Sequence, residues 1–201
     1  RLAESPMALR RLKNILMGKV NLPGLTVDQD KRWKLLQRLV AFDYPQSQQL
    51  LDLEKRKDPS LNGELSYLAA QASRPNWKVK EGWIQKLLRE RKQLRYAEYK
   101  SVAYSLFPES QVKLRNQFAP EFLDSLTQLN SSDQVRLAYS FSALAPQECK
   151  KPLGVIEKAL NSDIEWKALV RKRLRVMGQQ FERCRKAISK AKNNQTLSQA
   201  G

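Results

Sequence analysis

Apolar residues recur every three or four positions through most of the chain, which is the spacing of one face of an α-helix. Short breaks containing Pro, Ser, Asp or Gly separate these segments. Glycine and proline number only seven and nine in 201 residues, so a turn-rich β architecture is disfavoured. Asn62-Gly63 would suit a hairpin, but its flanks do not alternate, and we expect helix there. The pattern predicts an all-α fold with helices near residues 5–18, 27–42, 46–57, 61–72, 77–89, 94–107, 110–129 (one or two), 133–144, 152–160 and 164–192.

The expected helices come in pairs about every 30 to 40 residues, a spacing typical of α-solenoids built from HEAT or armadillo repeats. No clear repeat signature emerges when the pairs are compared, so we expect an irregular solenoid. We predict one continuous domain over residues 1–192 and a polar, disordered tail at 193–201. Because the chain begins at Arg1 rather than Met, we expect it to be part of a longer polypeptide.

The formal charge of +17 is concentrated in a few helical segments. Residues 164–201 alone carry ten basic and two acidic side chains. Within them, Arg171, Lys172, Arg173 and Arg175 form a candidate site for an anion or a peptide. Four such neighbours spread around most of a helix, so a solvated surface is the favoured interpretation and an anion site the alternative.

Three other groups of side chains could have a binding or catalytic role, but each also fits an ordinary position in the core or on the surface. Tyr96 and Tyr99 lie among basic residues and could stack on bases, but their spacing favours core positions. Carboxylates such as Asp52 and Glu54, or Glu90 and Glu98, are expected on solvated helix faces rather than in a catalytic pair. The four tryptophans (33, 77, 83 and 166) are expected in or beside the core.

Several classes of chemistry are excluded by composition. The chain has no histidine, so it has no zinc-binding His-Glu-x-x-His helix and no histidine base of its own. No glycine-rich phosphate loop is present. We therefore predict no catalytic, metal-binding or cofactor-binding residue in this chain. Cys149 and Cys184 are expected to be free thiols in a reducing compartment, and this, with the lack of an apolar run long enough to span a membrane, favours a cytoplasmic location.

Four stretches, taken in order, resemble the C-terminal helical domain of the aminopeptidase N family of zinc metallopeptidases. Asp30–Leu39 is similar to that domain's Arg-Trp-x-x-Leu-x-x-Leu segment, and Asp58–Gly63 to its Asp-Pro-[Ser/Thr]-x-x-Gly. Ala69–Pro75 and then Lys80–Trp83 resemble its Ala-Ala-x-Ala-x-Arg-Pro segment and the Lys and Trp that follow. Phe107-Pro108 and the helix over 169–185 come in the matching order, so the likeness covers most of residues 5–188.

The resemblance implies a helical bowl that caps the active-site chamber of a zinc aminopeptidase and controls peptide access. It implies partners in the catalytic domain of the same polypeptide and in peptide substrates, with zinc held upstream of this chain. No substrate-contacting residue of the family maps onto a position here. Two alternatives stay open: a stand-alone basic helical-repeat protein that binds nucleic acid, and an adaptor that binds acidic peptides. Neither involves a membrane.

Overall fold

The computed structural model describes residues 4–90, 93–118, 121–122, 125, 136, 143–145, 151–161, 163 and 165–199. Within these ranges the regular structure is helical, without a strand, as the sequence predicted. The expected helix over 133–144 lies almost wholly outside the described residues. The chain divides into two compact units, Arg1–Gln111 and Val112–Gly201. The predicted single domain over 1–192 stays a prediction.

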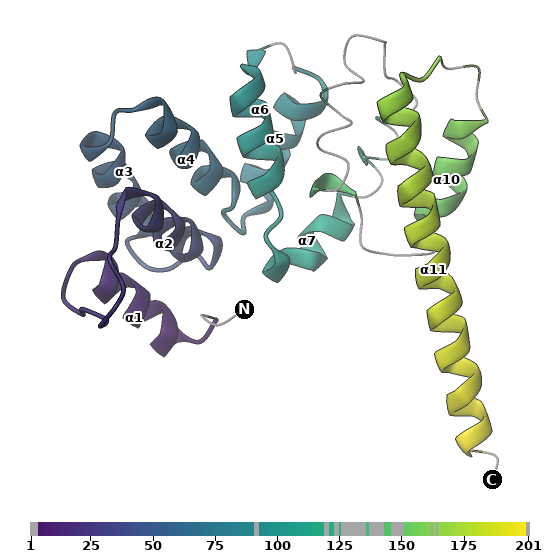
Figure 1. Cartoon of the computed structure of the whole chain (residues 1–201), viewed down its shortest axis with the longest axis horizontal. Coiled ribbons are helices and arrows are strands. Elements are labelled where there is room, and N and C mark those ends of the chain that lie inside the picture. Colours follow the sequence, from purple (N-terminus) through teal and green to yellow (C-terminus); the bar gives the residue numbers. More distant parts are fainter. Residues whose placement is uncertain are drawn as a thin grey trace. The chain divides into compact units, whose positions relative to one another are not determined.

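The first unit contains six α-helices (Figure 1). They are α1 Pro6–Leu16, α2 Gln29–Ala41, α3 Ser47–Lys57, α4 Leu61–Ala72, α5 Trp77–Leu88 and α6 Tyr96–Ser105, followed by the 3₁₀ turn η2 Glu109–Gln111. Side chains cap four of them: Ser5, Asp28, Ser60 and Asn76 each accept a hydrogen bond from the backbone N–H three residues on. Because these caps define each start, α2 begins at Gln29 and not at residue 27.

Every helix of this unit packs on the next, and α4 also packs between α2 and α6. The even-numbered helices thus form one layer, and α1, α3 and α5 connect and flank them. A core fills the space among α1 to α4, and its fully or nearly fully buried members are Leu9, Leu16, Trp33, Leu36, Leu39, Val40, Leu51 and Ala70. Burial of these apolar surfaces is the main force that holds the helices together.

The described elements of the second unit are α7 Val112–Gln117, α10 Lys151–Leu160 and α11 Ala168–Gln199. α10 and α11 lie side by side, and α11 continues well beyond the end of α10 (Figure 1). Val170, Leu174, Met177 and Phe181 form the buried face of α11. The indole of Trp166 is buried beside them and donates a hydrogen bond of 2.8 Å to the carbonyl of Ala159 in α10.

Two predictions about this unit are corrected. α11 extends to Gln199 rather than ending at residue 192, because neither Gly nor Pro lies between residues 193 and 199 and the Gln and Leu residues there favour helix. Cys184 is disulfide-bonded and not a free thiol. The sequence could not reveal this, since pairing depends on which residues the fold brings together. Cys149 lies outside the described residues. In the described part of the chain, no helix is both long and apolar enough to cross a membrane.

Candidate functional site

A groove of about 270 Å³ lies on the layer formed by α2, α4 and α6. Trp33, Leu65 and Ala69 give it apolar surface, while Asp30 and Lys34 bring opposite charges. The remaining lining residues are polar and uncharged: Gln37, Asn62, Ser66 and Ser101. Such a mixture suits the backbone and side chains of a peptide better than a small apolar ligand.

Hydrogen bonds among Trp33, Asp58, Ser60 and Gly63 hold α2 to the turn that precedes α4, beside this groove. The indole Nε1 of Trp33 donates a 2.7 Å hydrogen bond to Oδ2 of Asp58, and Oδ1 of Asp58 accepts from the backbone and hydroxyl of Ser60. Ser60 Oγ accepts in turn from the N–H of Gly63, which caps α4. A Cβ on Gly63 would lie 2.3 Å from the carbonyl oxygen of Asp58, so the close approach requires glycine. The hydroxyl of Ser60 and the indole of Trp33 lower the pKa of Asp58.

An ion pair joins the first three helices. Arg32 in α2 binds both carboxylate oxygens of Glu54 in α3, through Nε at 2.6 Å and through a terminal nitrogen at 2.5 Å. Its other terminal nitrogen donates to the carbonyl of Leu16 at the end of α1, and Gln29 also donates to Glu54. Burial alone would raise the pKa of Glu54, but the hydrogen bonds from Arg32 and Gln29 outweigh it and lower that pKa. The prediction that Glu54 lies on a solvated face is therefore wrong, since its side chain is only 3% exposed.

A buried lysine joins the ends of two helices. Lys80 in α5 is fully buried, and its Nζ donates to the carbonyls of Ala72, the last residue of α4, and Leu106, which follows α6. The same Nζ lies 5.4 Å from the centre of the Phe107 ring. These carbonyls carry the partial negative charge of a helix C-terminus, so they suit an ammonium group. Burial nevertheless lowers the pKa of Lys80 to about 7.

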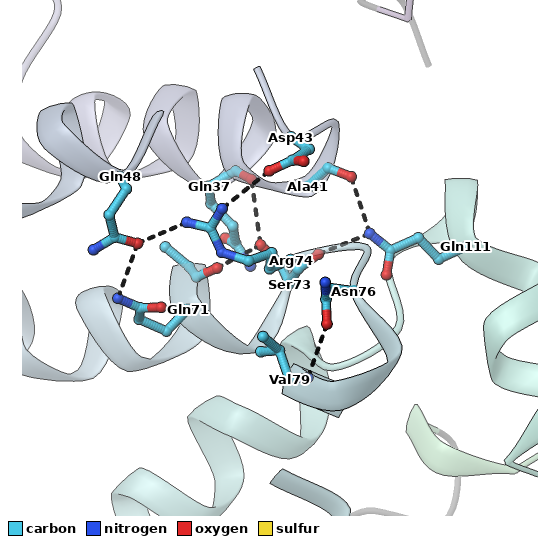
Figure 2. Close-up of polar contacts among 11 residues, drawn as sticks. Gln37, Ala41, Asp43, Gln48, Gln71, Ser73, Arg74, Asn76, Val79 and Gln111 are labelled. Carbon is cyan, nitrogen blue, oxygen red and sulfur yellow. Dashed lines mark hydrogen bonds and ion pairs between the residues drawn. The ribbon is translucent and has the colours of Figure 1, made fainter. Parts of the chain in front are cut away.

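Gln111 makes the equivalent connection between α2 and α4 (Figure 2). Its side-chain nitrogen donates to the carbonyls of Ala41 at 3.0 Å and Ser73 at 2.7 Å. Arg74 strengthens the same edge, because it donates to Asp43 and Gln48 from the loop after α2 and the start of α3. Trp33 and Asp58 meet near the starts of α2 and α4, and Arg95 and Glu64 near the starts of α4 and α6. The three helices therefore run in the same direction, with their C-terminal ends bound by Lys80 and Gln111.

The candidate anion site suggested by the sequence lies elsewhere, on α11. Arg171, Lys172, Arg173 and Arg175 are all exposed there. Lys172 and Arg175 lie one turn apart on the side opposite the buried residues of α11, and Arg171 lies one turn before Arg175, whereas Arg173 points to a different side of the helix. The structure thus brings three of the four residues together.

The sequence did not predict which residues hold the helices of the groove in place. It expected Tyr99 in the core, which is confirmed, but it expected the same of Tyr96, which is 43% exposed. Of the tryptophans, Trp33 and Trp166 are buried, and Trp77 and Trp83 are partly buried. Lys80 and Gln111 could not have been recognised, because a lysine at core spacing carries no sequence signal for the carbonyls it meets. In the described residues no three His, Cys, Asp or Glu side chains gather as metal ligands would.

No model of a known protein family matches the chain, and no curated protein matches it.

Proposed function

We propose that this chain is the C-terminal helical domain of a zinc-dependent aminopeptidase, where it caps the active-site chamber and controls peptide access. In this role the chain catalyses nothing alone. Its partners are the catalytic domain of the same polypeptide and peptide substrates. The disulfide of Cys184 removes the support that free thiols would have given to a cytoplasmic location.

The observation that carries the proposal is the connection among the residues of the four resembling stretches. Trp33 from the first stretch binds Asp58 from the second, and Gly63 permits the close turn there. Lys80 from the fourth stretch binds Ala72 in the third. Residues that share no local sequence thus depend on one another in three dimensions, which supports a shared domain architecture rather than chance similarity of short segments.

The helix arrangement of the first unit supports an irregular α-solenoid of the HEAT or armadillo type. Successive helices pack in chain order, and α2, α4 and α6 form a parallel layer. Repeats of this kind expose one layer along a continuous surface suited to extended ligands. The groove over Trp33 and Ser66 lies on that layer, and we assign it to the surface that faces the peptide.

The zinc of the proposed parent enzyme is assigned to residues outside this chain. The sequence contains no histidine, and the described residues offer no cluster of acidic or sulfur ligands. In this role residues 1–201 take no part in the chemical step. Their contribution is to bind and select peptides before the reaction.

Reading the coding sequence upstream of Arg1 is the first test. We expect a His-Glu-x-x-His helix with a further Glu ligand downstream of it. A start codon at or just before Arg1 would contradict the proposal, because no catalytic domain would then exist for this chain to cap.

The groove is tested in the parent enzyme by filling it. Ser66→Trp should raise KM for peptides of several residues, since the new ring occupies the groove, and should leave hydrolysis of a single-residue fluorogenic amide unchanged. Gln85→Trp, which places the same ring at an exposed position on α5, is the matched control. Equal effects of the two variants would show that the groove does not contact peptides.

A further inference from the structure

Five basic residues form a straight stripe along α11. They are Lys172, Arg175, Arg183, Lys186 and Lys190, at relative positions i, i+3, i+11, i+14 and i+18. At about 100° per residue these positions fall within one side of the helix. From Lys172 to Lys190 the stripe is about 27 Å long at 1.5 Å per residue. From the sequence a solvated surface was the favoured interpretation, because Lys172, Arg175, Glu182 and Lys186 do not sustain a basic stripe without interruption.

The stripe lies opposite the packed face of α11. Val170, Leu174, Met177 and Phe181 are buried, and the same helical geometry places the basic residues about half a turn away from them. All five stripe residues are exposed. In Figure 1 the C-terminal part of α11 continues beyond the end of α10.

Little acidic charge compensates the stripe within the described residues. Lys186 pairs with Glu182 at 2.8 Å, and no ion pair involves the other four members there. Glu182 is the one acidic residue of α11, whereas Arg171, Arg173 and Arg185 add further positive charge beside the stripe. Placing like charges along one helix face costs stability unless a partner supplies the opposite charge.

The length and composition of the stripe favour one class of anionic partner over the others. An amphipathic helix that inserts into a lipid surface needs a broad exposed apolar face. That face of α11 is buried from Val170 to Phe181, and beyond it Ile188 is the large apolar side chain left exposed among the described residues. A protein interface usually centres on a cluster of apolar or aromatic anchors, whereas the stripe is flanked by a single valine, Val176, which is 39% exposed. The lack of aromatic side chains also disfavours stacking on unpaired bases. A row of cations about 27 Å long, with a gap of eight positions between Arg175 and Arg183, instead matches the length of about eight base pairs of a duplex, at roughly 3.4 Å each.

We propose that the stripe Lys172, Arg175, Arg183, Lys186 and Lys190 binds the phosphate backbone of a nucleic acid duplex, without preference for base sequence. The stripe carries only cationic groups, which contact phosphates and provide no base readout. This binding is independent of peptide access through the groove on α2, α4 and α6.

The test is fluorescence anisotropy of a labelled mixed-sequence DNA duplex of about 20 base pairs, titrated with the full chain at several salt concentrations. With five phosphate contacts, the plot of log affinity against log salt should have a slope of about −4 to −5. Changing all five stripe residues to Gln should weaken binding at least about tenfold and flatten the slope. Circular dichroism checks that the exposed substitutions leave the helix content unchanged.

A matched control separates the stripe from net charge. Arg10, Arg11, Lys19, Lys78 and Lys100 are exposed residues of the first unit, with the same numbers of Lys and Arg. Changing them to Gln removes the same charge and should alter duplex affinity less than about threefold. Equal weakening by both sets would overturn the proposal, as would binding to poly-glutamate or to phosphatidylserine vesicles that is tighter than binding to the duplex.

Discussion

The indole of Trp33 donates a hydrogen bond to the carboxylate of Asp58 and thereby ties α2 to the turn that starts α4. The indole is 4% exposed, so few alternative partners are available to its N–H. The same carboxylate orders Ser60, which caps α4 through Gly63. The carboxylate of Asp58 thus both holds α2 against this turn and positions the residue that caps α4, beside the candidate groove.

The effect on stability of removing the Trp33 indole hydrogen bond should depend on whether Asp58 is present. Trp33→Phe should lower the free energy of unfolding by about 1–3 kcal/mol, since it removes the donor and some packed surface. In a double-mutant cycle with Asp58→Asn, measured by urea denaturation, the interaction energy should be about 1 kcal/mol. Strictly additive effects would contradict the bond.

Glycine is required at position 63 and dispensable at position 82. Gly63→Ala should cost about 2–3 kcal/mol, because its Cβ would meet the backbone of Asp58. Gly82→Ala, on α5 with nothing within 4 Å, should stabilise the protein by up to about 1 kcal/mol through helix propensity. Tryptophan fluorescence during urea unfolding measures both, and three of the four tryptophans lie in the first unit. Similar effects at the two positions would rule out the steric explanation.

Lys80 should make stability depend on pH in the alkaline range. Its pKa is about 7 in the folded protein and 10.5 as the ordinary value. Between these values the unfolded state holds more protons, so the free energy of unfolding should rise with pH, by at most about 1.4 kcal/mol per unit. Lys80→Met should remove this rise, whereas Lys78→Met, at an exposed neighbour, should keep it. Parallel profiles for the wild type and Lys80→Met between pH 7 and 10 would be evidence against the buried titration.

Glu54 should make the free energy of unfolding depend on pH in the acid range. Glu54→Gln leaves Arg32 without its carboxylate and should lower the free energy of unfolding by about 2–4 kcal/mol at neutral pH. Because the folded pKa of Glu54 lies below the ordinary 4.5, its contribution is present above pH 4.5 and is lost as the pH falls through the folded pKa. The variant should therefore have a flatter acid profile than the wild type in chemical denaturation. Glu81→Gln, which changes an exposed residue of α5, is the control and should change neither quantity.

Local signals predicted the helices well. Apolar spacing places the helices of the first unit, and the caps Ser5 and Ser60 with the breaks Asp43–Pro45 and Ser73–Pro75 define their limits. The ends of α11 were predicted less well, because no cap or breaker marks them and a polar composition was taken for disorder.

The groove and its supports required the tertiary structure. Helical spacing indicates that a residue such as Lys80 points inward, but the carbonyls of Ala72 and Leu106 come together there only when α4, α5 and α6 pack. Likewise, the sequence around Glu54 is that of an ordinary surface carboxylate, and its pairing with Arg32 from another helix is seen only in the folded structure.

The amino-acid sequence by itself determined that this protein is helical, where most helices begin, and that it brings no histidine chemistry, because these follow from local periodicity, capping and composition. The tertiary structure alone decided which polar groups are buried together, where the groove lies, and which basic residues share a long exposed face. Those properties depend on burial and on contacts between segments far apart in the chain, which a local pattern does not contain.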